Sequence, residues 1–213
     1  MRVKTSLYVY LLCAIFTALT VVCAQIMVPL PFTPVPINLT LLAVFASGGV
    51  LGPKRGAVAI LVYLLLGVIG VPVFSGLQGG LGVLAGPNGG FIIGYVLVAF
   101  VYGYFYRISN DTKRTASPAL PTALKFLKTV ALGLPAIAVC YATGTVWFVI
   151  STGTEVWASL LMCVIPFIPG DLLKLVAAST VSKLFKNPCA PSSKPGGTPK
   201  ENIKETRQSE KDS

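Results

Sequence analysis

Two charged residues stand inside an apolar stretch near the end of the sequence. Asp171 and Lys174 are three positions apart, which places their side chains on one face of a helix. A charge near the bilayer centre costs about 2.5–3.5 kcal/mol on insertion scales, so such residues usually pair and mark a ligand or ion pathway. An ion pair that only stabilises the last helix, or a lysine that extends its ammonium to the membrane surface, would also explain them. We favour a ligand-binding pair.

Several other chemistries are excluded by what the sequence lacks. It contains no histidine, and its five cysteines include no C-x-x-C pair, so we expect no metal or haem site. No G-x-x-x-x-G-K-[ST] motif occurs, so the chain does not hydrolyse ATP itself. No pairing of a nucleophile with a base is visible either. We therefore predict a protein that holds or moves a small molecule, not an enzyme, and expect no cofactor.

The composition is that of a protein surrounded by lipid. Hydrophobic residues make up 54% of the 213 residues and charged residues only 11%, against about 25% charged in a soluble domain. The formal net charge is +10, but the basic residues flank apolar segments instead of forming a groove with interleaved aromatics. The lipid bilayer is thus the expected partner, and nucleic acid is not.

The apolar segments predict an all-α membrane protein with six transmembrane helices. Four prolines between the first two segments exclude a helix there, because proline lacks an amide donor and clashes with the preceding turn. The second and third segments have near 15 residues, so they are either short spans or a hairpin that does not cross fully. The tail is polar and predicted to be disordered, which gives a six-helix domain at 1–186 and a tail at 187–213. The predicted helices are 7–26, 37–51, 56–70, 91–106, 125–150 and 170–185.

The loop charges predict the orientation. Lysine and arginine occur at the N-terminus, at 52–55, at 107–128 and after the last helix, whereas the loops at 27–38, 71–90 and 151–156 have none. This alternation fits six crossings with both termini in the cytoplasm. The last helix would then begin on the outer side, so that Lys174 points into the domain.

A glycine-rich, uncharged stretch at 74–90 is too apolar for a solvated linker. Non-helical backbone near a membrane persists only against protein or beside a water-filled cavity. We therefore expect this loop to dip back over the domain as a lid or a pocket wall.

Six motifs occur in the order and spacing of a known family. They are Pro34-Val35-Pro36-Ile37, Leu51-Gly52-Pro53-Lys54, Tyr63-Leu64-Leu65-Leu66-Gly67, Gly70-Val71-Pro72-Val73-Phe74, Gly86-Pro87-Asn88-Gly89-Gly90 and Gly170-Asp171-Leu172-Leu173-Lys174. In these motifs the chain resembles the BioY family, the biotin-binding S components of energy-coupling factor (ECF) transporters. The resemblance runs from the first helix to Lys186.

The resemblance implies the S-component fold and high-affinity biotin uptake across the cell inner (plasma) membrane. It also implies partners, namely a transmembrane coupling protein and two ATPase subunits that drive release inward. A solitary carrier of biotin or another small vitamin, without an ATPase partner, fits the same sequence.

The resemblance also assigns residues. Asp171 and Lys174 match the family's ligand-binding pair. The substrate-binding candidates beside them are Asn88, which offers a donor and an acceptor, Phe74, which could cover an apolar ring, Gln78, and Asn38, where the family commonly has threonine. Ala14 and Ala18 form a small-xxx-small pattern similar to the family's docking surface for the coupling protein.

Overall fold

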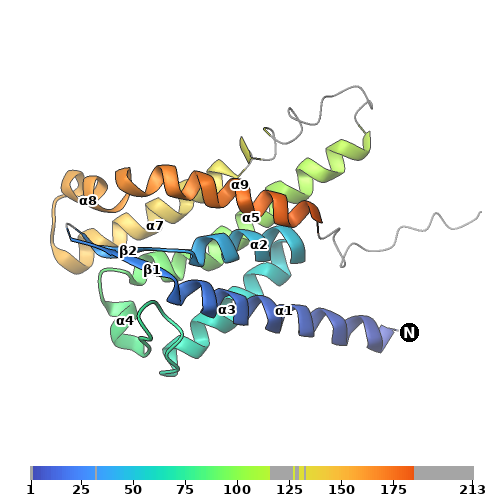
Figure 1. Cartoon of the computed structure of the whole chain (residues 1–213), viewed down its shortest axis with the longest axis horizontal. Coiled ribbons are helices and arrows are strands. Elements are labelled where there is room, and N and C mark those ends of the chain that lie inside the picture. The colour runs from blue at the N-terminus through green and yellow to red at the C-terminus, as the bar shows by residue number, and fades with distance from the viewer. Residues whose placement is uncertain (1, 32, 116–126, 128–129, 132, 185–213) are drawn as a thin grey trace, which may run out of the picture.

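The computed structural model describes residues 2–31, 33–115, 127, 130–131 and 133–184. This part of the chain is mostly helical, and Figure 1 shows its elements in order. They are α1 (Arg2–Gln25), β1 (Met27–Leu30), β2 (Thr33–Asn38), α2 (Thr40–Leu51), α3 (Pro53–Val68), α4 (Leu81–Ala85), α5 (Gly89–Thr115), α7 (Leu134–Thr152), α8 (Val156–Cys163), the 3₁₀ turn η1 (Ile165–Phe167) and α9 (Ile168–Leu184).

Four segments of the described residues are helical, long and apolar enough to cross a membrane. The fourth runs through α8, η1 and α9, while α2 is apolar but shorter. Large apolar side chains are exposed along the outside of the bundle, for example Leu173 at 70% and Ile150 at 71%. A surface of this kind is stable against lipid tails, so the chain is membrane-embedded. The four segments are Leu7–Gln25, Gly89–Ile108, Leu134–Thr152 and Val156–Ser182.

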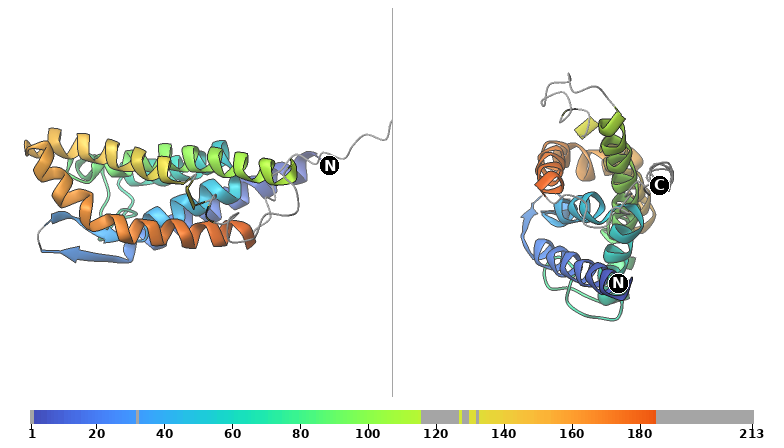
Figure 2. Two further views of the ribbon diagram at one scale, coloured as in Figure 1. Left: turned by 90° about the horizontal axis from the view of Figure 1, so that it is seen from above. Right: turned by 90° about the vertical axis from the view of Figure 1, so that its right-hand side faces the viewer.

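The long helices lie along a common direction and give the molecule two distinct ends (Figure 2). The N-terminus of α1 and the C-terminal end of α9 lie at the same end of the molecule (Figure 1). The two strands, α4 and α8 lie at the opposite end. We call this second end the loop end, because it carries the segments that connect the helices there.

The prediction of an all-α chain was wrong at one place, because the proline-rich segment forms a β-hairpin. Strands β1 and β2 pair antiparallel, with Met27 opposite Asn38 and Leu30 opposite Thr33. The register shifts between Val28 and Leu30, where Pro29 has no amide to donate. In a two-stranded ribbon both outer edges are unpaired, so prolines are tolerated in it. The prolines therefore exclude a helix without excluding a strand.

Helix α5 is in contact with three other helices, α2, α3 and α7. Close approach of α5 to α2 depends on small residues at the crossing. A Cβ at Gly103 would overlap the carbonyl oxygen of Gly48 and the backbone of Pro53. The backbones of α2, α3 and α5 therefore lie in direct contact at this crossing.

Some predicted helix boundaries differ from the structure. The fourth predicted helix was to end at 106, but α5 continues to Thr115. The last one was to open at Gly170-Asp171, but α9 begins at Ile168 and includes Pro169. Proline fits the first turn of a helix, where its missing amide leaves no hydrogen bond unmade. The predicted tail, 187–213, lies outside the described residues.

Candidate functional site

The two charged residues of α9 form a buried ion pair. Lys174 Nζ lies 2.7 Å from Asp171 Oδ1, and the two residues are only 9% and 4% exposed. Asp171 lies in the first turn of α9, where the positive end of the helix dipole favours a carboxylate. The pair faces a cavity between the helices and does not face lipid or the outer surface.

A tyrosine from a different helix completes this polar group. The hydroxyl of Tyr141, on α7, donates to Asp171 Oδ2 at 2.7 Å. Each carboxylate oxygen therefore already accepts one hydrogen bond and keeps a second lone pair for a ligand. Lys174 uses one of its three N–H donors on Asp171, and no other described residue accepts the remaining two. The group therefore offers donors and acceptors side by side.

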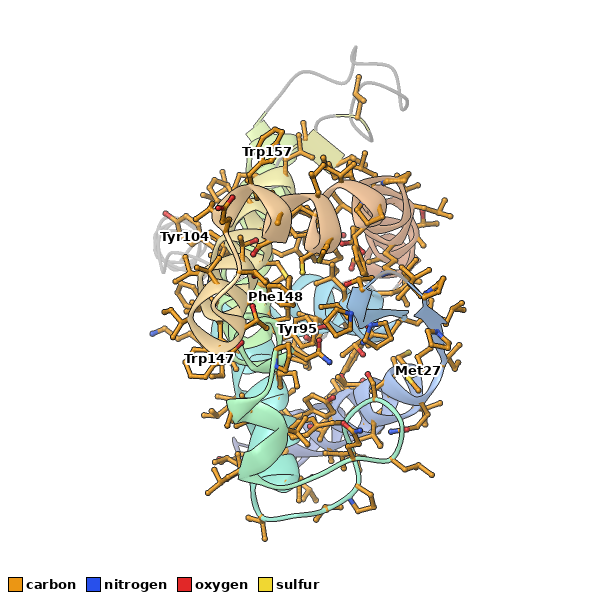
Figure 3. All side chains as sticks on the ribbon, turned by 90° about the vertical axis from the view of Figure 1, so that its left-hand side faces the viewer. Met27, Tyr95, Tyr104, Trp147, Phe148 and Trp157 are labelled. Carbon is orange, nitrogen blue, oxygen red and sulfur yellow. The ribbon has the colours of Figure 1, made fainter. Side chains whose placement is uncertain are left out.

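The cavity lies toward the loop end and is bounded by β2, α2, α3, the 74–90 loop, α5, α7 and α9. Its empty space, counting the part that is open to solvent, is about 710 Å³. Aromatic rings make up much of the wall, and Tyr95 occupies the middle of the bundle in Figure 3. A mostly apolar wall with one charged group suits a compact heterocyclic ligand.

The glycine-rich loop forms part of this wall, as predicted. Phe74 is 1% exposed and meets the ring of Tyr63 edge-on, with centroids 5.6 Å apart. Gly67 permits this contact, because a Cβ there would overlap the Phe74 ring. Phe74 and Gln78 exchange two backbone hydrogen bonds of 3.0 and 3.3 Å, which close a tight turn. Phe74 and Gln78 both line the cavity.

One glutamine side chain ties this loop to the end of α1. Gln25 Nε2 donates to the carbonyls of Val73 and Phe74 at 3.2 and 3.1 Å, and its Oε1 accepts from the amide of Leu77 at 3.0 Å. Leu77 has a φ of 56°, an uncommon backbone conformation for leucine. Gln25 thus satisfies the backbone of a strained turn beside the cavity. Gln25 was not predicted from the sequence.

Asn38 joins the hairpin to the same loop. Its Nδ2 donates to Ser75 Oγ at 3.0 Å, and its Oδ1 accepts from the amide of Thr40 at 3.3 Å. Asn38 lines the cavity, but its side chain is engaged in these two contacts. Its predicted contact with a ligand stays a prediction.

Two acceptors in the cavity wall have no hydrogen-bond partner among the described residues. They are Oδ1 of Asn88, just before α5, and Oγ1 of Thr40, at the start of α2. A buried polar atom without a partner costs about 1–3 kcal/mol. Two residues before Asn88, the carbonyl of Gly86 accepts a hydrogen bond from Trp147 Nε1 at 3.1 Å, which ties this segment to α7. A ligand with N–H or O–H donors would satisfy both acceptors.

Ala14 and Ala18 are not among the residues that line the cavity. They are exposed on α1, while Phe16, Thr17 and Thr20 on its other face are buried. The structure therefore brings Asp171, Lys174, Asn88, Phe74, Gln78 and Asn38 to one cavity and leaves the two alanines on the outer surface.

The comparisons with known proteins all lead to one family. The model of the BioY family matches residues 1–190. A biotin transporter BioY from Rhizobium etli is 36% identical over 173 residues, covering 81% of this chain and 89% of that protein. One from Thermotoga maritima is 37% identical, covering 81% and 92%. A crystal structure of the S-component for biotin from an ECF-type ABC transporter aligns with a TM-score of 0.71 and 27% identity, covering 86% of this chain and 91% of that one.

Proposed function

This chain belongs to the BioY family, and from that membership we propose that it takes up biotin as the substrate-binding S component of an ECF-type transporter. The family consists of transport proteins, so the chain is not an enzyme. The single observation of the structure that carries the proposal is the Asp171–Lys174 pair, buried in the wall of a cavity between the helices.

The polar group matches the chemistry of biotin. Biotin has a ureido ring with two N–H donors and one carbonyl acceptor, a thiophane ring, and a valerate carboxylate. The second lone pairs of Asp171 can accept from the ureido N–H groups, each as a charge-assisted hydrogen bond of about 1.5–3 kcal/mol. The free donors of Lys174 can serve a ligand oxygen. Tyr141, which donates to Asp171 Oδ2, would orient the carboxylate for the ligand.

The remaining candidates complete the pocket. Asn88 Oδ1, unpaired in the described structure, would accept from the ligand. The buried ring of Phe74 would cover the thiophane ring, which is apolar. Gln78 lies where the 74–90 loop meets the cavity, and Asn38 would act by holding the hairpin against that loop.

We assign six crossings, with both termini in the cytoplasm, in the cell inner membrane. Helices α2 and α3 are the short crossings, with lengths of about 18 Å and 24 Å, against about 30 Å of hydrocarbon. Support comes from the distribution of charge, since Lys54 and Arg55 open α3 at the end of the bundle opposite the cavity. In that orientation the cavity faces outside, where biotin arrives.

The proposed partners are a transmembrane coupling protein and two ATPase subunits. The chain has no P-loop of its own, so the energy for inward release must come from elsewhere. Ala14 and Ala18 are the proposed contact, because small exposed side chains one helical turn apart let another helix approach closely.

We place the membrane domain at 1–186 and treat 187–213 as an appendage. Removing the residues after Lys186 should leave biotin affinity unchanged, because the described residues that line the cavity all precede it. Loss of binding in the shortened protein would assign the tail a part in the site.

Binding of labelled biotin to the purified full-length protein tests the function. We expect saturable binding that unlabelled biotin displaces and that thiamine and riboflavin do not. Displacement by either of those vitamins, or the absence of saturable binding, would contradict the proposal.

A further inference from the structure

A second hollow adjoins the cavity on the loop end, and we call it the vestibule. It lies between the hairpin, which contributes Met27, Leu30 and Thr33, and the loop, which contributes Gly76. The vestibule and the cavity share four lining residues, namely Pro36, Ser75, Gln78 and Asn88. Met27, Gly76 and Gln78 are exposed, so the vestibule is open to the outside. In Figure 3 Met27 lies at the rim of the molecule and Tyr95 lies at its centre.

The two hollows differ in charge. Among the described residues that line them, Lys174 is the one cation and Asp171 the one anion, and both belong to the cavity. The vestibule is lined by uncharged side chains throughout its described part. The vestibule therefore offers no counter-charge to a carboxylate, and a neutral group placed there loses no ion pair.

The pairing of the charges decides which end of biotin enters the cavity. Lys174 Nζ is 2.7 Å from Asp171, so a valerate carboxylate placed on that ammonium would also meet the aspartate and be repelled. The neutral ureido ring suffers no such repulsion, and it offers N–H donors to Asp171 and a carbonyl to Lys174. The ring system then occupies the cavity, and the valerate chain points toward the vestibule.

We infer that this protein accepts biotin whose carboxyl group is joined to another molecule through an amide, such as biocytin (biotinyl-lysine). This inference rests on the proposed function and extends its substrate class from free biotin to carboxyl conjugates. The carboxyl end lies in an uncharged, open vestibule, so converting it to an amide removes no charge pair. The attached lysine extends outward between the hairpin and the loop.

Competition against labelled biotin on the purified full-length protein tests the inference. We expect biotin carboxamide and biocytin each to compete with an affinity within tenfold of that of biotin. If Lys174 bound the valerate, the carboxamide would lose a charge-assisted contact and compete more than tenfold more weakly, which would overturn the inference. If biotin carboxamide competed with an affinity within tenfold of that of biotin but biocytin did not, the vestibule would be overturned as the site of the conjugate.

A substitution in the vestibule gives an independent measurement. Leu30→Trp narrows the vestibule from the hairpin side and should weaken biocytin at least tenfold more than it weakens biotin carboxamide. Val28→Trp is the matched control, since Val28 is on the same strand, 60% exposed, and lines neither hollow. An equal effect of Leu30→Trp on both compounds would overturn the inference. Failure of free biotin itself to bind the unsubstituted protein would instead overturn the proposed function.

Discussion

Substitution of Asp171 by asparagine removes one charge from the site and almost nothing from its shape. In the structure the two carboxylate oxygens accept from Lys174 and Tyr141, each at 2.7 Å, and the ligand would take a further lone pair. The single amide oxygen of asparagine cannot serve three donors. The NH₂ group would also face the ureido donors of biotin. We therefore expect Asp171→Asn to weaken biotin binding at least tenfold, about 1.4 kcal/mol.

The same substitution should also lower the stability of the fold. Removing one member of a buried ion pair leaves the other charge uncompensated, which typically costs about 3–5 kcal/mol. In Asp171→Asn the uncompensated buried charge would be the ammonium of Lys174. The double variant Asp171→Asn with Lys174→Met removes both charges, and replacing both partners is often neutral. We expect it to regain most of the lost thermal stability without regaining biotin affinity.

Titration with labelled biotin and thermal unfolding in detergent separate these two effects. Ser179→Ala is the matched control, since Ser179 is buried on the same helix and its hydroxyl bonds only to the Val176 carbonyl, outside the cavity. The control should keep its affinity. If Asp171→Asn folded and bound biotin as tightly as the unsubstituted protein, the assignment of Asp171 to the site would be refuted.

Three further substitutions test other parts of the account. Tyr141→Phe removes the second donor to Asp171 and should weaken biotin two- to tenfold in the same titration, because the carboxylate loses the hydrogen bond that orients it toward the ligand; an unchanged affinity would show that the carboxylate needs no orienting. Gln25→Ala removes three hydrogen bonds to the 73–77 turn and should raise both the biotin dissociation rate and the amide hydrogen-exchange rate of that turn. Unchanged amide exchange would show that the turn is stable without Gln25. Replacing Ala14 and Ala18 together by tryptophan should abolish biotin uptake into cells while leaving biotin binding in detergent intact. Uptake at the normal rate would show that the coupling protein docks on another surface.

The polar centre of the site was only partly predictable from sequence. The i, i+3 spacing of Asp171 and Lys174 sets one shared helix face, and the absence of other charges in apolar segments singles the pair out. Tyr141 was missed, because it is thirty residues away and reaches Asp171 only across the cavity that α7 and α9 both line. Nothing in its local sequence distinguishes it from the other tyrosines. Gln25 was missed for the same reason, since its partners belong to a loop about fifty residues further along.

The fold was predictable in its periodic parts and less so between them. Apolar length predicted helices at the four segments that are long enough to span, because a lipid-exposed backbone must satisfy its hydrogen bonds within a helix. The segment at 27–38 was expected to lack helix, but its pairing as β1 and β2 depends on contacts across a turn. The short helix α4 (Leu81–Ala85) depends on α5, which it packs against, and has no buried side chain of its own.

The claim that underlies all of these predictions is that the cavity with Asp171 and Lys174 holds biotin and returns it unchanged. Mass spectrometry of the small molecules that co-purify with the full-length protein tests it most directly. The account predicts that intact biotin co-purifies with the unsubstituted protein. The Asp171→Asn variant should carry less than one equivalent of biotin, or none. A different vitamin, a chemically altered biotin, or equal biotin content in the variant would contradict it.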